Sequence, residues 1–168
     1  MRWRLMTPDD IATVHAIATV TYPSLPEPAS CMAERQRLCP AGCLVLDQAP
    51  AHLGHAPLGY AIAHPWRLGD PPPLAAMLGS LPARPDTFHI HDVALLPSAR
   101  GRGLARHALD ALIGAARSLG LPALSLVAVA GSAAFWATCG FESADHLCPP
   151  ARLESYGADA RYMIRRAT

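Results

Sequence analysis

The sequence predicts a single α/β domain over residues 1–168, in which helices flank a mixed sheet. A length of 168 residues is typical of one domain, and 51% hydrophobic against 16% charged residues is enough for a sizeable core. Segments with strand and helix patterns alternate along the chain, and no internal repeat or second domain interrupts them. We therefore expect one sheet built from both halves of the sequence.

Turn and periodicity signals place the elements of the first half. Thr7 before Pro8 and two acidic residues is typical of a helix start, because the hydroxyl caps the helix and acids favour its positive end. The expected order is a strand at 3–6, this helix, a helix at 30–38, and strands at 43–46 and 58–64. The loop between those two strands contains His52 and His55.

The second half opens with a long Pro-rich connection, 71–86, of the kind often found beside functional sites. A strand at 88–96, a helix at 101–119, a buried strand at 124–129 and a short helix at 132–138 are expected next, and strands at 141–147 and 161–165 close the sheet.

Composition argues against several classes of protein. The formal net charge is +1, so no strong field indicates nucleic acid or a membrane surface as a partner. The five cysteines are odd in number and lack a Cys-x-x-Cys pair, and we expect neither disulfides nor a metal. The N-terminus lacks the apolar core of a signal peptide, and glycines and a proline interrupt the uncharged run 119–141. These features predict a cytoplasmic protein.

The most informative segment, 92–105, places a strand, a glycine-containing turn and a helix in succession. Unpaired backbone N–H groups at a helix start lie at the positive end of its dipole and can hold an anion. Gly101 and Gly103 would let a pyrophosphate approach the backbone, and Arg100 and Arg102 add positive charge. An ordinary strand–helix turn with surface arginines is the alternative reading.

Two motifs in this order resemble those of GNAT acetyltransferases. Arg100-x-x-Gly103-x-Ala105 matches the family's Arg/Gln-x-x-Gly-x-Gly/Ala signature, after a segment, 93–97, that resembles its cofactor strand. Phe135-Trp136-x-x-x-Gly140-Phe141 is similar to its Phe-Tyr-x-x-x-Gly-Phe junction.

The resemblance implies a mostly antiparallel mixed sheet with splayed central strands, and acetyl-CoA bound between them. Backbone groups of Val93, Ala94 and Leu95 would align the pantetheine and the acetyl group. The remaining cofactor contacts would come from Arg100, Gly101, Arg102, Gly103, Leu104, Ala105, Ser132 and Trp136. At the position of Trp136 the family has a tyrosine that commonly protonates the leaving thiolate. Trp136 departs from this pattern, because an indole is not a usable acid.

A base with a pKa near neutral would help to deprotonate an amine acceptor, and histidine fits this need. His89 and His91 lie on one face of the expected strand. The segment 89–95 resembles the His-x-His segment of arylalkylamine N-acetyltransferases, whose paired histidines relay protons through water. The alternative is two polar residues on a partly exposed strand.

Four further residues are candidates. Asp92 is a second base candidate. A regular strand would place it on the opposite face from the histidines, and a bulge would change that; the alternative is a carboxylate that caps a helix or anchors a loop. Tyr156 is a candidate for the missing acid, and packing on the sheet is the alternative. Tyr22 and Glu27 lie between the first two helices, where this fold presents acceptor-binding residues; a solvated loop acid is the alternative for Glu27.

The resulting prediction is an acetyl-CoA-dependent N-acetyltransferase acting on a primary amine, a small molecule that is aromatic or polyamine-like. A protein or peptide N-terminus is the alternative acceptor, and a CoA-binding regulatory module without catalysis is the alternative class. We expect no nucleic-acid, membrane or metal partner, and the sequence leaves a homodimer open.

Overall fold

The computed structural model describes residues 1–48 and 56–168; the segment 49–55, which includes His52 and His55, lies outside the described residues. The strands are β1 (Arg2–Leu5), β2 (Cys43–Asp47), β3 (Gly59–Trp66), β4 (Thr87–Leu95), β5 (Ala123–Ala128), β6 (Glu142–Ser143) and β7 (Arg161–Arg166). The α-helices are α1 (Ile11–Thr21), α2 (Ala29–Leu38), α3 (Leu104–Ser118) and α4 (Ala133–Thr138).

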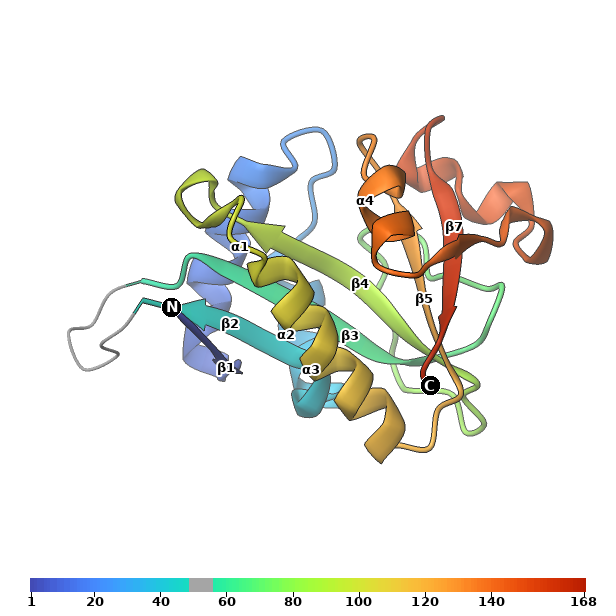
Figure 1. Cartoon of the computed structure of the whole chain (residues 1–168), viewed down its shortest axis with the longest axis horizontal. Coiled ribbons are helices and arrows are strands. Elements are labelled where there is room, and N and C mark those ends of the chain that lie inside the picture. Colours follow the sequence, from blue (N-terminus) through green and yellow to red (C-terminus); the bar gives the residue numbers. More distant parts are fainter. Residues whose placement is uncertain (49–55) are drawn as a thin grey trace.

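All described strands form one sheet in the order β1-β2-β3-β4-β5-β7-β6. Only β4 and β5 pair in parallel, and every other neighbouring pair is antiparallel. The predicted mixed, mostly antiparallel sheet is therefore confirmed (Figure 1).

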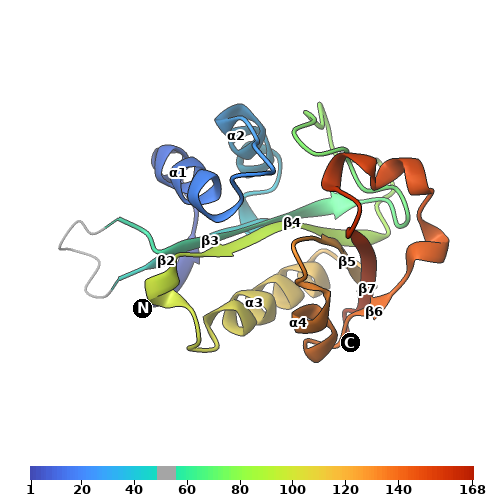
Figure 2. The same ribbon diagram turned by 90° about the horizontal axis from the view of Figure 1, so that it is seen from above.

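Helices cover both faces of the sheet (Figure 2). α1 and α2 lie on one face, above a core that includes Val14, Met32 and Tyr60. α3 and α4 lie on the other face, and the α3 residues Leu109 and Leu112 pack in a larger core with Phe88 and Phe141. The apolar side of α3 thus faces the sheet.

Two expected boundaries differ from the structure. The helix predicted from residue 101 begins at Leu104, because Gly101 and Gly103 have positive φ angles of 73° and 71° and form a turn before it. The strand predicted at 141–147 is reduced to the two residues of β6, and Asp145–Leu147 forms a 3₁₀ turn instead.

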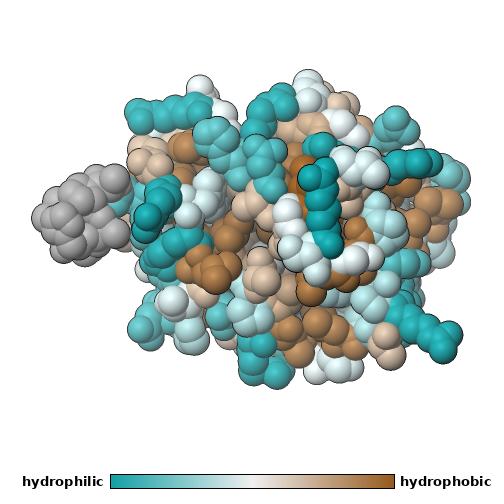
Figure 3. Space-filling model, turned by 60° about the horizontal axis from the view of Figure 1, so that its bottom comes forward, coloured by the Kyte–Doolittle hydropathy of each residue, from teal (hydrophilic) through white to brown (hydrophobic). Residues whose placement is uncertain are grey.

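On the surface drawn in Figure 3, apolar patches are separated by polar side chains. Among residues 1–48 and 56–168, no helix combines the length and the apolar character needed to cross a membrane. The same residues contain no cluster of three or more His, Cys, Asp or Glu side chains arranged to hold a metal ion.

Candidate active site

The candidate site lies where the two central strands separate. β4 and β5 pair only over residues 88–90 and 124–126, and beyond these pairs the strands diverge (Figure 1). A cavity of about 770 Å³ lies there, a volume within the usual range for ligand pockets. Its wall is formed by α1 and the segment after it, β4, the glycine turn, β5, α4 and Tyr156.

The outer half of β4 presents to this cavity a backbone edge that is not paired with β5. The N–H of Leu96 bonds the carbonyl of Leu58 on the β3 side, so the polar groups of Leu95 and Val93 point to the opposite edge. Their carbonyls accept hydrogen bonds from Arg100 Nε at 2.9 Å and from the Tyr22 hydroxyl at 3.0 Å. Their N–H groups lie on this same edge, where β5 no longer pairs with them.

The glycine turn forms the second wall. Within the described part of the chain, the backbone N–H groups of residues 101–105 have no intramolecular hydrogen-bond partner. Intrahelical bonding begins only at Arg106, whose N–H bonds the carbonyl of Gly103 at 3.0 Å. A side chain at Gly101 or Gly103 would meet no atom within 4 Å, so the space beside this turn is open. This row of free donors at the start of a 15-residue helix fits a pyrophosphate.

The arginines around the turn differ from the prediction in one respect. Arg100 lines the cavity, as expected, whereas Arg102 does not. Arg106 lines it instead, donating two hydrogen bonds to Thr138 and lying 5.9 Å from the centre of the Phe135 ring. Its position in the first helical turn, next to the anion-binding backbone, is the sequence signal for this residue.

A β-bulge brings His91 and Asp92 to the same face of the sheet. In the pairing with β3, Asp92 lies opposite Ile62 and Ile90 lies opposite Ala63, which leaves His91 as the extra residue. The opposite placement of Asp92 was expected only for a regular strand, and the bulge replaces it with a shared face. Both side chains line the cavity.

Asp92 is held by Tyr60 in a buried setting. The Tyr60 hydroxyl donates a hydrogen bond to its carboxylate. Burial raises the pKa of Asp92 to about 6, and the hydrogen bond from Tyr60 offsets only part of this rise. A carboxyl group that titrates near pH 6 on a cavity wall is suited to holding or exchanging a proton at neutral pH.

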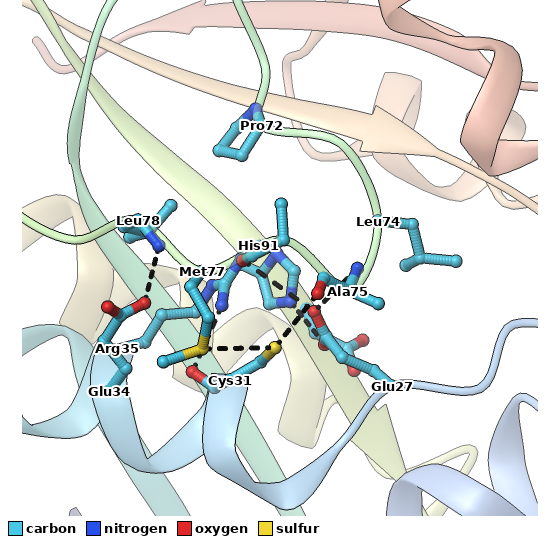
Figure 4. Close-up of polar contacts among 12 residues, drawn as sticks. Glu27, Cys31, Glu34, Arg35, Pro72, Leu74, Ala75, Met77, Leu78 and His91 are labelled. Carbon is cyan, nitrogen blue, oxygen red and sulfur yellow. Dashed lines mark hydrogen bonds and ion pairs between the residues drawn. The ribbon is translucent and has the colours of Figure 1, made fainter.

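Glu27 is a buried partner of His91, so the alternative reading of it as a solvated loop acid is wrong (Figure 4). Glu27 Oε2 lies 2.7 Å from His91 Nε2, and the two side chains are only 7% and 3% exposed. Since a carboxylate only accepts hydrogen bonds, Nε2 carries the hydrogen and Nδ1 of the neutral ring is an acceptor. Nδ1 is buried and has no partner among the described residues.

The carboxylate of Glu27 also contacts a backbone N–H group and a buried arginine. Glu27 Oε1 accepts a hydrogen bond from the N–H of Ala75 at 3.2 Å, and the fully buried Arg35 lies 3.8 Å away (Figure 4). Burial alone would raise the pKa of Glu27, but the hydrogen bond with His91, the charge of Arg35 and the bond from the N–H of Ala75 outweigh it and hold this pKa below its usual value. Glu27 therefore stays ionised and fixes the orientation of the His91 ring.

His89 lies deeper than its predicted partner. It is 1% exposed, does not line the cavity and bonds Ser125 through Nδ1 at 3.1 Å, at a point where β4 and β5 are still paired. Burial, with additional effects of His64, His91 and Arg35, lowers the pKa of His89 well below its usual value. A neutral imidazole in this position is suited to a structural role in the core.

Both candidate tyrosines line the cavity with hydroxyl groups that are already engaged. Tyr22 donates to the carbonyl of Val93, and Tyr156 donates to the carbonyl of Pro72. Burial is the largest cause raising the pKa of each phenol. Each hydroxyl thus ties the segment that carries it to another part of the site.

The α4 wall carries Ser132 and Trp136, both of which line the cavity. Ser132 Oγ accepts a hydrogen bond from the N–H of Val129 at 3.2 Å, closing the turn between β5 and α4. The Trp136 ring is 8% exposed and packs edge-on against Phe135 and Phe141, with centroids 5.2 and 5.4 Å away.

Solved structures with similar folds have bound a range of ligands. GphF, a GNAT-like decarboxylase in complex with isobutyryl-CoA, has a TM-score of 0.78 and 17% identity, covering 100% of both chains. N-acetylglutamate synthase from Neisseria gonorrhoeae, complexed with coenzyme A and N-acetyl-glutamate, has a TM-score of 0.72 and 17% identity. The match covers 99% of this chain and 35% of that one. The NatC complex bound to Gag peptide and CoA has a TM-score of 0.69 and 13% identity, and the match covers 99% of this chain and 98% of that one.

None of the curated proteins matches this chain in sequence. The model of the acetyltransferase (GNAT) family matches residues 11–141, which include the splayed strands, the glycine turn and α4. The chain belongs to the acetyltransferase (GNAT) family.

Proposed function

We propose that this protein transfers the acetyl group of acetyl-CoA to the primary amine of a small molecule. The observation that supports this most directly is one cavity that is lined both by a cradle of free N–H groups and by the His91–Asp92 pair. The cradle suits a pyrophosphate, and the acid–histidine pair suits an ammonium group that must lose a proton.

The residues present fit acetyl-CoA along the whole cavity. Residues 101–105 would hold the pyrophosphate, with Arg100 and Arg106 as neighbouring positive charges. The free edge of β4 at Val93 and Leu95 would bind the pantetheine through backbone groups. When bound, the cofactor supplies an acetyl group already activated as a thioester.

The proton of the acceptor would pass to His91. Asp92, ionised above about pH 6, attracts the ammonium group, and the Nδ1 atom of His91 is a free acceptor on the adjacent residue. Glu27 orients the imidazole and stabilises it once it is protonated. A water molecule between the amine and Nδ1 would complete the relay. We propose no proton transfer for His89 or Tyr156, because neither has a free group at the cavity.

Two alternatives remain, and both can be tested. A peptide or protein N-terminus would enter the same cavity, and a regulatory module would bind acetyl-CoA without turnover. The oriented His91–Glu27 pair favours turnover, because cofactor binding alone needs no base.

The first experiment measures free thiol release from acetyl-CoA with a panel of amines, amino acids and peptides, and identifies the products by mass. Acetylation of a small amine is the expected result. Peptide acetylation alone would support the first alternative, and tight acetyl-CoA binding without any acceptor-dependent thiol release would support the second. An acyl-CoA bearing a β-carboxylate, incubated without amine, tests the decarboxylation associated with one structural neighbour.

Replacing Gly103 with Val is expected to raise the Kd for acetyl-CoA by at least about tenfold, or roughly 1.4 kcal/mol. Gly103 has φ of 71°, and a branched side chain there would lie in the open space beside the turn. Calorimetry measures this Kd. Gly120→Val is the matched control, because Gly120 has a similar φ of 69°, faces open space and does not line the cavity. Equal affinities of the two folded variants would refute the pyrophosphate site.

Replacing Trp136 with Phe is expected to leave most of kcat, because the ring forms a packed wall and donates no proton in the proposed mechanism. An ordinary thiol has a pKa of about 8.5, so the leaving thiolate can take its proton from water. Steady-state kinetics and cofactor titration check this prediction. A loss of about a hundredfold in kcat, with unchanged acetyl-CoA affinity, would identify the indole N–H as an essential donor.

A further inference from the structure

We infer that the acceptor end of the cavity selects an apolar monoamine that carries no carboxylate, and discriminates against amino acids and polyamines. This inference rests on the proposed function, since it names the class of amine that the same site would accept. Four observations support it: the distribution of charge along the cavity, the scarcity of free donors, the masking of Arg35 and the apolar wall.

Charges of opposite sign lie at opposite ends of the cavity. Its lining cations are Arg100 and Arg106, both at the glycine turn, where the cofactor phosphates would engage them. Its lining acids are Glu27 and Asp92, both where the acceptor would lie. An ammonium group therefore meets attraction at the acceptor end, and a carboxylate beside it meets repulsion from two acids.

The acceptor end also offers few hydrogen-bond donors. The hydroxyls of Tyr22 and Tyr156 already donate to the carbonyls of Val93 and Pro72. Thr21 contributes a buried hydroxyl that has no partner among the described residues. One neutral hydroxyl cannot balance a buried carboxylate, although it can accommodate a polar uncharged group on the acceptor.

The nearby cation Arg35 is masked. It is fully buried and does not line the cavity, and its NH2 group lies 3.8 Å from Glu27 Oε1 and 3.1 Å from the carbonyl of Ala76 (Figure 4). Glu27 is thus both the cavity-facing group and the counterion of Arg35. A carboxylate on the acceptor would meet the acid and not the arginine behind it.

The rest of the acceptor wall is apolar and is formed by Ala18, Leu25, Met32 and Leu74. A diamine would bring its second ammonium group to these side chains, where Glu27 is already engaged by His91, the N–H of Ala75 and Arg35, so the second charge would be buried without a free partner. A hydrocarbon or aromatic body would instead gain by leaving water. The wall therefore favours one amine on an apolar body.

Three acceptors of the same skeleton test the discrimination against carboxylate: phenethylamine, phenylalaninol and phenylalanine. The last two differ mainly in replacing a neutral hydroxymethyl group by a carboxylate. We expect kcat/KM for phenylalaninol to exceed that for phenylalanine by about a hundredfold or more, and to lie within about tenfold of that for phenethylamine. Pentylamine should exceed cadaverine by at least about tenfold. Phenylalanine acetylated as fast as phenylalaninol, or cadaverine as fast as pentylamine, would overturn the inference.

Calorimetry with CoA-saturated protein separates this inference from the proposed function. Preferential binding of phenylalaninol without any acetylation would refute acetyl transfer and leave the charge selection standing. Failure of phenethylamine and phenylalaninol to bind any tighter than phenylalanine would refute the charge selection, whether or not turnover occurs.

A pair of variants tests the role of Glu27 in the selection. Glu27→Gln removes the cavity-facing charge and uncovers Arg35, so the preference for phenylalaninol over phenylalanine should fall by at least about tenfold. Glu34→Gln is the control, because Glu34 is another buried acid that binds the same loop, through the N–H groups of Leu78 and Gly79, and does not line the cavity. The preference of Glu34→Gln for phenylalaninol over phenylalanine should be unchanged. An equal fall of this preference in both variants would refute the role of Glu27.

Discussion

Replacing Asp92 with Asn should raise KM for the amine by about a hundredfold while leaving acetyl-CoA affinity unchanged. Loss of one partner from a close charge pair typically costs on the order of 2 to 5 kcal/mol, which spans this factor. In the native protein, kcat/KM should rise with pH through about 6, because Asp92 must be ionised to attract the ammonium group. The variant should lose the part of this rise that comes from the ionisation of Asp92.

The same substitution should make the protein more stable at alkaline pH. The pKa of Asp92 is raised from 3.8 to about 6 by folding, so its ionised form is disfavoured in the folded state and stability is lost as pH rises through this interval. The resulting loss in the free energy of unfolding is at most about 3 kcal/mol at pH 8 and about half of that at pH 5. Asn can still accept the hydrogen bond from Tyr60, and it removes the charge.

Urea unfolding at pH 8 and pH 5 measures this gain, and Asp110→Asn is the control, since Asp110 is an exposed acid on α3. An Asp92→Asn variant that is less stable than the native protein at pH 8, or that keeps native KM, would contradict the assignment. A gain in stability combined with a loss of substrate binding is the behaviour expected of a charge kept for function at the expense of folding.

The cofactor side of the site could be predicted from the sequence because it depends on local signals. Gly101 and Gly103 are required by positive φ angles in a turn before a helix, and this requirement is visible in the residue types and their spacing. The order of strands and helices was predicted for the same reason: the periodicity of apolar residues changes from element to element. The predicted start of α3 was wrong by the length of the turn itself.

The acceptor side could not be predicted in the same way, because it depends on contacts between distant segments. Asp92 reaches the cavity through a bulge in the β3–β4 pairing, which no residue type in the sequence specifies. Glu27 is separated from His91 by 64 residues, and its burial depends on Arg35 and on Ala75 in the Pro-rich connection. An acid in a loop is usually solvated, so only the assembled structure distinguishes this one.

Separate replacement of the two histidines is expected to give very different effects on acetyl transfer. His91→Gln should lower kcat by about a hundredfold or more, the usual lower range for loss of a general base, with little change in cofactor affinity. Gln can still donate to Glu27, so the variant removes the proton acceptor while retaining a partner for this acid. His89→Gln should change kcat by only a few-fold, because His89 bonds Ser125 in the core and does not line the cavity.

These two variants form a matched pair, since the residues share one strand, one face and the same substitution. Single-turnover kinetics at saturating amine and acetyl-CoA would isolate the transfer step from product release. Equal hundredfold losses in both folded variants, with native thermal stability, would restore a relay that uses both histidines. Native kcat in His91→Gln would exclude His91 as the base and leave Asp92 or water to accept the proton. A loss confined to His91 is the result that the free Nδ1 atom and the orienting carboxylate of Glu27 predict.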